Sequence, residues 1–119
     1  MMRKDRDYFV RHGRAVFYSC MLNDFMSAAA DCGWQLGLYG NFAVSLDMMA
    51  MPWNKIATPA DELVQRICDC FDDNRVLRNH IQKTKCDCGR VEYLIPLWKN
   101  DAAIRISVMD NRMFRNDDF

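Results

Sequence analysis

The sequence has no net charge, because 16 Lys and Arg residues balance 16 Asp and Glu residues. Without a strong field of one sign, there is no general reason to expect nucleic-acid binding or an acidic mimic of DNA. The sequence also lacks a long hydrophobic run. The longest, Phe42–Trp53, is interrupted by Ser45 and Asp47 and is too short to cross a bilayer. What remains is an ordinary globular chain of 119 residues, 50% of them hydrophobic, which is enough for one domain with its own core.

No apolar run follows the basic residues of the N-terminal stretch MMRKDRDYF. The sequence therefore predicts no signal peptide, a cytoplasmic protein and no membrane partner. Histidine is scarce, and His12 and His80 lie far apart without a cluster of carboxylates or thiols nearby, so both are expected at the surface. Cys86 and His80 could form a nucleophilic pair, but nothing in the sequence orients one toward the other.

The six cysteines invite a disulfide or metal interpretation. Disulfides are disfavoured in a cytoplasmic chain. The pairs Cys68/Cys70 and Cys86/Cys88 could supply four thiolates to zinc, but one intervening residue is fewer than structural zinc sites use. We therefore expect no metal and no cofactor. Instead, four of the cysteines are expected to pack as small hydrophobic side chains: Cys20, Cys32, Cys68 and Cys70.

The stretch from Trp34 to Trp53 predicts a hairpin. Apolar residues alternate along Trp34–Tyr39 and again along Ser45–Met51, which is the two-residue period of a strand. Gly40 and Asn41 between them favour a turn. Asp47 is then a single carboxylate within an otherwise uncharged strand, so it needs a partner, water or a function.

Two helices are predicted on either side of this hairpin. Residues 1–14 are a charged lead-in, and residues 15–32 follow with the period of a helix that has one buried face. The second helix begins with Thr58 as N-cap and Pro59 as its first residue. Its apolar face consists of Leu63, Val64, Ile67, Cys68 and Phe71.

The second half of the chain predicts further strands. Residues 75–88 are ambiguous, with a strand near Val76–Ile81 as one alternative. A strand follows over residues 90–99, where Pro96 suggests an edge position or a bulge, and another over residues 102–109. Residues 111–119 form a polar tail. This order predicts an α+β fold, a single domain over residues 15–110 with a mixed sheet and two main helices on one face.

The hairpin also carries a resemblance. The segments YGNFAVSLDMMAMPW (39–53) and AIRISVMDNR (103–112) resemble small phage and prophage proteins of the nucleotidyltransferase superfamily, in which they run like HGSxxRDLDLIAVPW and YIDLSVMPR. The resemblance covers roughly residues 15–110 and implies a nucleotidyltransferase-like mixed sheet. Enzymes of that superfamily hold divalent metals with the two acids of Asp-x-Asp and a third acid on a neighbouring strand. The metals bridge the triphosphate and stabilise the leaving pyrophosphate.

Carried across position by position, the pattern is degenerate. Gly40 is retained, while Asn41 stands where the superfamily has serine. Ser45 replaces the first acid, Asp47 retains the second, and Arg105 replaces the third. One carboxylate beside a guanidinium cannot hold two divalent ions, because magnesium needs several oxygen ligands.

If the two strands are neighbours, as the resemblance implies, Arg105 would form an ion pair with Asp47 where the metal stood. The alternative is that Arg105 extends to solvent and Asp47 is hydrated.

Several other residues are candidates for binding. Trp34, Trp53 and Trp98 either belong to the core and rim of the sheet or form an aromatic surface for a partner. Met49 and Met51, if exposed, would form an adaptable binding surface. The segment from Arg75 to Arg90 is basic and is either a solvated face or a contact for nucleic acid. The residues proposed for partner binding are Arg75, Arg78, Lys83, Lys85, Trp53 and Trp98.

The sequence therefore predicts a nucleotidyltransferase-fold protein that has lost metal-dependent catalysis and acts by binding a host protein or protein–nucleic acid complex. From the phage-type resemblance, one version is an inhibitor of a host defence system, such as an anti-CRISPR protein. One alternative is an active nucleotidyltransferase that uses Asp101 or Asp110 as substitute ligands. The other is a metal-independent nucleotide sensor that uses Gly40 and Asn41 for phosphate.

Overall fold

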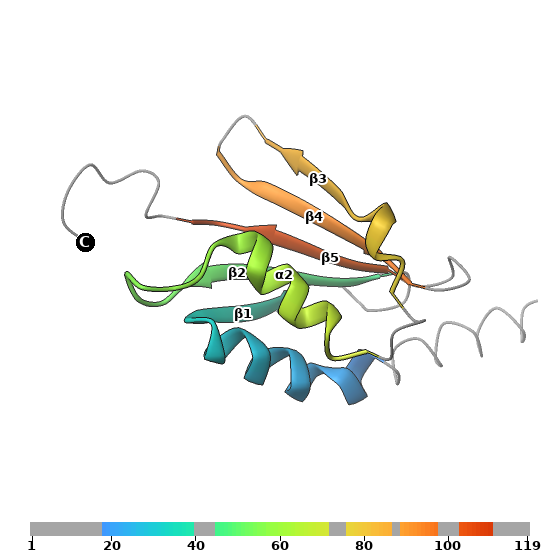
Figure 1. Ribbon diagram of the computed structural model, residues 1–119, viewed down its shortest axis with the longest axis horizontal. Coiled ribbons are helices and arrows are strands. Elements are labelled where there is room, and N and C mark those ends of the chain that lie inside the picture. Colours follow the sequence, from blue (N-terminus) through green and yellow to red (C-terminus); the bar gives the residue numbers. More distant parts are fainter. Residues whose placement is uncertain (1–17, 40–44, 72–75, 87–88, 98–102, 111–119) are drawn as a thin grey trace, which may run out of the picture.

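The chain folds around one five-stranded sheet with the strand order β1-β2-β5-β4-β3 (Figure 1). The computed structural model describes residues 18–39, 45–71, 76–86, 89–97 and 103–110. β2 and β5 run parallel, and every other neighbouring pair is antiparallel, so the sheet is mixed and the fold is α+β. The strands are β1 (Trp34–Tyr39), β2 (Leu46–Pro52), β3 (Gln82–Lys85), β4 (Val91–Pro96) and β5 (Ala103–Val108).

Two helices cover one face of this sheet. The N-terminal helix is described over residues 18–31, and α2 spans Ala60–Cys68. The two helices are in contact, because Arg66 of α2 lies 3.7 Å from Asp31 of the N-terminal helix. The ring of Phe25 also lies 5.4 Å from the ring of Phe71, just beyond α2. Tyr18 anchors the N-terminal helix to β5, donating a hydrogen bond to the Ala103 carbonyl at 3.2 Å. The core between helices and sheet is formed largely by Phe25, Ala29, Trp34, Leu46, Met48, Leu63, Ile67, Ile95, Ile104 and Ile106.

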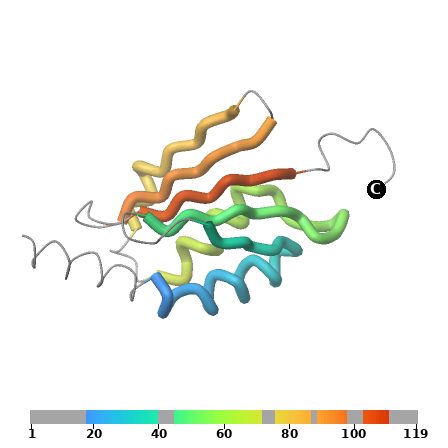
Figure 2. Tube along the Cα trace, turned by 180° about the vertical axis from the view of Figure 1, so that it is seen from behind, coloured from blue at the N-terminus to red at the C-terminus, as the bar shows by residue number. Residues whose placement is uncertain are grey.

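The other face of the sheet has no helix over it in the described part of the chain (Figure 2). The alternation of each strand decides which side chains lie there. On β2, Leu46 and Met48 are buried toward the helices, whereas Asp47 and Met49 point the other way. We call this side the uncovered face of the sheet.

The start of α2 differs by one residue from the expectation. Pro59, not Thr58, is the N-cap, with φ of −59° and ψ of 152°. The Pro59 carbonyl accepts the N–H groups of Glu62 and Leu63, so the first helical turn closes on this residue. Among the described residues, no side-chain hydrogen bond caps the helix, and the predicted Thr58 cap is wrong.

The ambiguous segment is also resolved in part. The alternative strand near Val76–Ile81 is wrong, because Val76 forms only an isolated bridge with Leu97 and Arg78–His80 form a short 3₁₀ helix, η1. The strand lies further on, at β3, whose four residues are all exposed. With no apolar anchor, β3 lacks the alternation by which strands are recognised.

Pro96 does not mark an edge strand. β4 lies inside the sheet, between β5 and β3. The pairing of β3 with β4 stops at Leu94, however, so Pro96 lies beyond the end of β3 and costs no hydrogen bond on that side.

Candidate functional site on the uncovered face

The positions of the degenerate motif meet on the uncovered face. In the parallel pairing of β2 with β5, Asp47 lies directly opposite Arg105. Tyr39 of β1 lies opposite Asp47 on the other side of β2. The predicted neighbourhood of Asp47 and Arg105 is therefore confirmed as a matter of backbone register.

The predicted ion pair between these two side chains is not formed within the described residues. Arg105 instead turns to β4, where its Nε lies 3.2 Å from Oε1 of Glu92. The contact is coulombic and not directional, since Nε makes no hydrogen bond within the described chain. Asp47 accepts a hydrogen bond of 2.7 Å from the Ser45 hydroxyl. Asp47 thus contacts Ser45 and Arg105 contacts Glu92, so the predicted ion pair between Asp47 and Arg105 is wrong.

Tyr39 closes part of the same surface. Its hydroxyl lies 3.3 Å from Oγ of Ser107, on β5. Because β2 lies between β1 and β5, the ring of Tyr39 must cross β2 to make this contact. Ser107 is only 1% exposed although none of the described helices covers it, and the Tyr39 contact is one reason.

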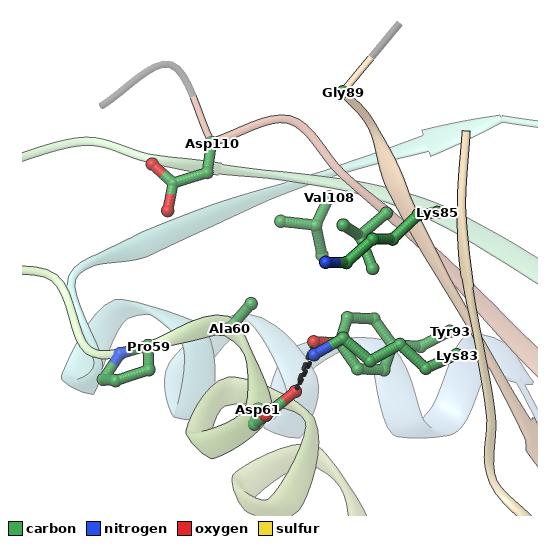
Figure 3. Close-up of a pocket in the computed structure, with 10 residues that line it drawn as sticks. Pro59, Ala60, Asp61, Lys83, Lys85, Gly89, Tyr93, Val108 and Asp110 are labelled. Atoms are coloured by element: carbon green, nitrogen blue, oxygen red, sulfur yellow. Dashed lines mark hydrogen bonds and ion pairs between the residues drawn. The ribbon is translucent and has the colours of Figure 1, made fainter. Parts of the chain in front are cut away.

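Within the described residues, this face lacks the cluster of acids that a two-metal centre uses. The described residues contain no group of three or more His, Cys, Asp or Glu side chains that could hold a metal ion. Asp110, one of the two substitute ligands considered, lines a pocket on the helix side of the sheet (Figure 3). It also lies five residues beyond Arg105, about 16 Å along an extended chain.

Six sequence-predicted positions lie outside the described residues: His12, Gly40, Asn41, Arg75, Cys88 and Trp98. The same is true of Asp101, the other substitute ligand, and of the segments 1–14 and 111–119.

Two of the predicted basic residues within the described chain, Arg78 and Lys83, contact α2 and the turn after it and are partly neutralised. Arg78 donates to Oδ1 of Asp69 at 2.6 Å and to Gln65 at 2.9 Å. Lys83 lies 3.1 Å from Oδ1 of Asp61. These contacts reduce the positive charge available to a nucleic acid.

Lys83 and Lys85 line a cavity of about 280 Å³ between α2 and the β3–β4 pair (Figure 3). The Tyr93 hydroxyl donates a hydrogen bond to Asp61 at its wall, and the Lys83 ammonium lies 5.5 Å above the Tyr93 ring. The Tyr93 hydrogen bond, followed by that of Lys83, lowers the pKa of the Asp61 carboxyl below its ordinary value of 3.8. Burial, and then the Asp61 carboxylate, raise the pKa of Tyr93. This triad joins the start of α2 to β3 and β4.

The remaining candidates divide between core and surface. Trp34 is buried and donates to the Thr58 carbonyl at 3.0 Å, whereas Trp53 is 58% exposed. Met49 and Met51 are 42% and 38% exposed, so both side chains are accessible, as an adaptable methionine binding surface requires.

The cysteines also differ. Cys32 and Cys68 are buried as expected, and burial raises the pKa of Cys68 to about 11. Cys70 is half-buried, while Cys20 is exposed, so the prediction of core packing is wrong for Cys20.

Three residues of this face were not identified from the sequence: Tyr39, Glu92 and Ser107. Alternation within β4 places Glu92 on one side of its strand, but only the strand order shows that β4 adjoins β5. No local signal in the sequence carries that order.

No described helix is long and apolar enough to span a bilayer. No protein-family model matches the chain, and no curated protein matches it. Among solved structures, the chain is similar to JHP933 from Helicobacter pylori, with a TM-score of 0.45 and 18% sequence identity. The match covers 82% of this chain and 44% of that protein, so this chain spans less than half the length of its structural relative. A likeness at this level supports no statement about function.

Proposed function

We propose that this protein acts by binding a macromolecular partner and does not catalyse metal-dependent nucleotidyl transfer. The observation that carries the proposal is the position of Arg105. Its backbone lies directly opposite Asp47, where the resemblance would place a third metal-binding acid.

The physical argument concerns charge. Two divalent ions need several oxygen ligands, and most of these are carboxylates in sites that bind triphosphates. Here Ser45 offers a hydroxyl, already donated to Asp47, and Arg105 offers a cation. Glu92 supplies a second carboxylate to this face, but it lies against the Arg105 guanidinium. A metal would have to displace that cation and overcome its repulsion.

The proposed partner is a host protein or protein–nucleic acid complex, and an inhibitor of host defence of the anti-CRISPR kind is one form of this. The support comes from the phage-type resemblance and from the exposed Met49 and Met51, whose flexible side chains suit an adaptable contact.

The first test is calorimetric titration of the full chain with each of the four ribonucleoside triphosphates, with and without magnesium. We expect no magnesium-dependent binding. Binding that requires magnesium would favour an active metal-dependent nucleotidyltransferase and overturn the proposal. Binding without magnesium would favour a nucleotide sensor, with Gly40 and Asn41 as the candidate phosphate contacts.

A gain-of-function variant tests whether Ser45 and Arg105 are the reason that the site binds no metal. Ser45→Asp combined with Arg105→Asp restores the two missing acids of the pattern beside Asp47. We expect this double variant to bind Mn²⁺ in electron paramagnetic resonance titrations in which the wild-type chain binds none. Adding Asp47→Asn to the double variant is the matched control and should abolish the binding. Equal Mn²⁺ binding by the wild-type chain would show that Arg105 does not exclude the metal.

A further inference from the structure

β1 is an edge strand of unusual composition. It lies at the end of the strand order, so only one side of its backbone is paired with a strand, β2. Its sequence, WQLGLY, contains no charged residue and no proline. Natural edge strands are usually protected by such residues, because free backbone groups can pair with another chain.

The pairing register shows which backbone groups point outward. In an antiparallel pair, hydrogen-bonded and non-hydrogen-bonded positions alternate. The Trp53 N–H donates to the Gly33 carbonyl at 3.0 Å, which makes this pair a hydrogen-bonded one. Counting along the register, Gln35, Gly37 and Tyr39 face β2.

Leu36 and Leu38 therefore direct their N–H and C=O groups away from the sheet. Within the described residues, none of these four groups forms a hydrogen bond. Leu38 is also 38% exposed although its side chain is on the helix side. The outer edge of β1 thus presents two donors and two acceptors at the spacing of a strand.

A groove lies next to this edge. It has a volume of about 340 Å³ and lies between the N-terminal helix and β1. None of its lining residues is charged: Met26, Ala30, Trp34, Gln35, Leu36 and Trp53. Met26 and Trp53 are 40% and 58% exposed, so apolar side-chain surface is available beside the strand edge.

From this juxtaposition we propose that β1 takes up an extended, uncharged strand of a partner protein, which pairs with Leu36 and Leu38 and places an apolar side chain in the groove. Main-chain hydrogen bonds would give affinity and the groove would give selectivity, as in strand addition generally. A charged side chain would lose its hydration in this groove without gaining a counter-charge. The inference rests on the proposed function, since it names the surface and the chemistry of the partner.

A second copy of the chain fits this edge less well. The N-terminal helix lies on the helix side of the sheet and, in both views, extends beyond β1 (Figures 1 and 2), with the groove between helix and strand. Pairing two β1 strands about a two-fold axis would bring two such helices to the same side of the seam. Packed helices need about 8–10 Å between their axes, whereas paired strands lie about 4.8 Å apart. A single extended segment carries no such helix.

The experiment uses a phage-displayed library of random twelve-residue peptides, panned on the full chain. A selected peptide is synthesised with a fluorophore, and its binding is measured by fluorescence anisotropy. Two further versions carry N-methyl groups at alternate residues, one set along each edge of the peptide strand. We expect N-methylation of one edge to weaken binding at least tenfold and N-methylation of the other to change it less than twofold, because only one edge faces β1.

The matched protein variants are Leu36→Pro and Lys85→Pro. Both remove an outward N–H from an edge strand, the first at β1 and the second at β3, where Cys86 and Arg90 form the reference hydrogen-bonded pair. We expect about tenfold weaker binding for Leu36→Pro and no change for Lys85→Pro. If Leu36→Pro fails to fold, the two N-methylated peptides still decide the question.

The proposal is overturned if the library yields no peptide that binds with a Kd below about 1 mM, or if both N-methylated versions bind with the same Kd. It is also overturned if sedimentation shows a dimer that Leu36→Pro abolishes, because the edge would then belong to a second copy. None of these results depends on magnesium or nucleotides, so failure here is distinguishable from failure of the proposed function.

Discussion

The two edges of the sheet are built in opposite ways. β1 carries no charge and is held by a buried anchor, Trp34, which is 1% exposed. β3 reads QKTK, all four of its residues are exposed, and it contributes nothing to the core. It is tied to the body by polar contacts instead, chiefly that of Lys83 with Asp61. One edge is stabilised by burial and left open, whereas the other is stabilised by charge.

This difference bears on where a partner can bind. Lysines on an edge strand oppose pairing with another chain, because an added strand would have to desolvate them. Lys83 and Lys85 therefore protect β3, while β1 has no equivalent residue. A protein that needed only to remain monomeric would gain from a charge on both edges. The unprotected edge is thus where we expect function.

The largest expected effect is at the anchor of β1. Trp34→Ala removes a fully buried ring together with its hydrogen bond to the Thr58 carbonyl. We expect the free energy of unfolding to fall by about 3–5 kcal/mol, measured by urea denaturation. The control on the other edge is Gln82→Ala, which should change it by less than about 0.5 kcal/mol, because Gln82 is exposed. Similar losses at both sites would remove the distinction between the edges.

The next largest loss of stability is expected at Gly33, directly before β1. Gly33 has φ of +84°, and a Cβ added there would lie 2.9 Å from Cα of Ala57. Gly33→Ala should therefore cost about 1–3 kcal/mol through backbone strain and close contact. Gly37→Ala is the matched control within β1: an added Cβ meets nothing within 4 Å, and we expect a change below about 1 kcal/mol. A larger loss at Gly37 than at Gly33 in thermal denaturation would contradict this account.

The contrast between the edges also explains what the sequence could predict. The alternation of β2 and β5 is visible because each buries the side chains of one face, and β1 alternates in sequence although Trp34 is its buried residue. The ranges of all three strands were predicted to within one residue. β3 buries nothing, so no periodicity marks it. The helix over residues 18–31 was visible for the same reason as β2 and β5.

The candidate site was predictable only where the resemblance supplied the strand order. That order correctly placed Asp47 beside Arg105. It did not predict that Glu92, on the far side of β5, would take the guanidinium. A side chain as long as arginine can reach several neighbouring residues. Which of them it contacts depends on the side chains of three adjacent strands, here β2, β5 and β4.

The tie between α2 and β4 should show a moderate effect that depends on pH. Tyr93→Phe removes the hydroxyl that donates to Asp61, and we expect a loss of about 1 kcal/mol at pH 7. The folded-state pKa of Asp61 is lowered, so its contribution to stability is complete above its ordinary value of 3.8 and is lost as pH falls through the lowered value.

Urea denaturation of the wild-type and Tyr93→Phe proteins across the acid range measures this. The stability difference should be constant above about pH 5 and shrink below pH 3.8. A difference that grew on acidification would mean that Tyr93 acts through another group. Asp61→Asn provides the control, because Tyr93→Phe in that background should show no change of its effect with pH.

The smallest effect is expected at the surface ion pair before β3. Arg78 lies 2.6 Å from Asp69, but the two side chains are 37% and 58% exposed, so solvent and salt screen them. Arg78→Gln should lower stability by less than about 1 kcal/mol, and 1 M NaCl should remove most of the difference in melting temperature. Arg66→Gln is the control, since Arg66 lies 3.7 Å from Asp31 and should contribute less still. A loss well above 1 kcal/mol, or one that persists in high salt, would contradict the weak, screened contribution expected of this ion pair.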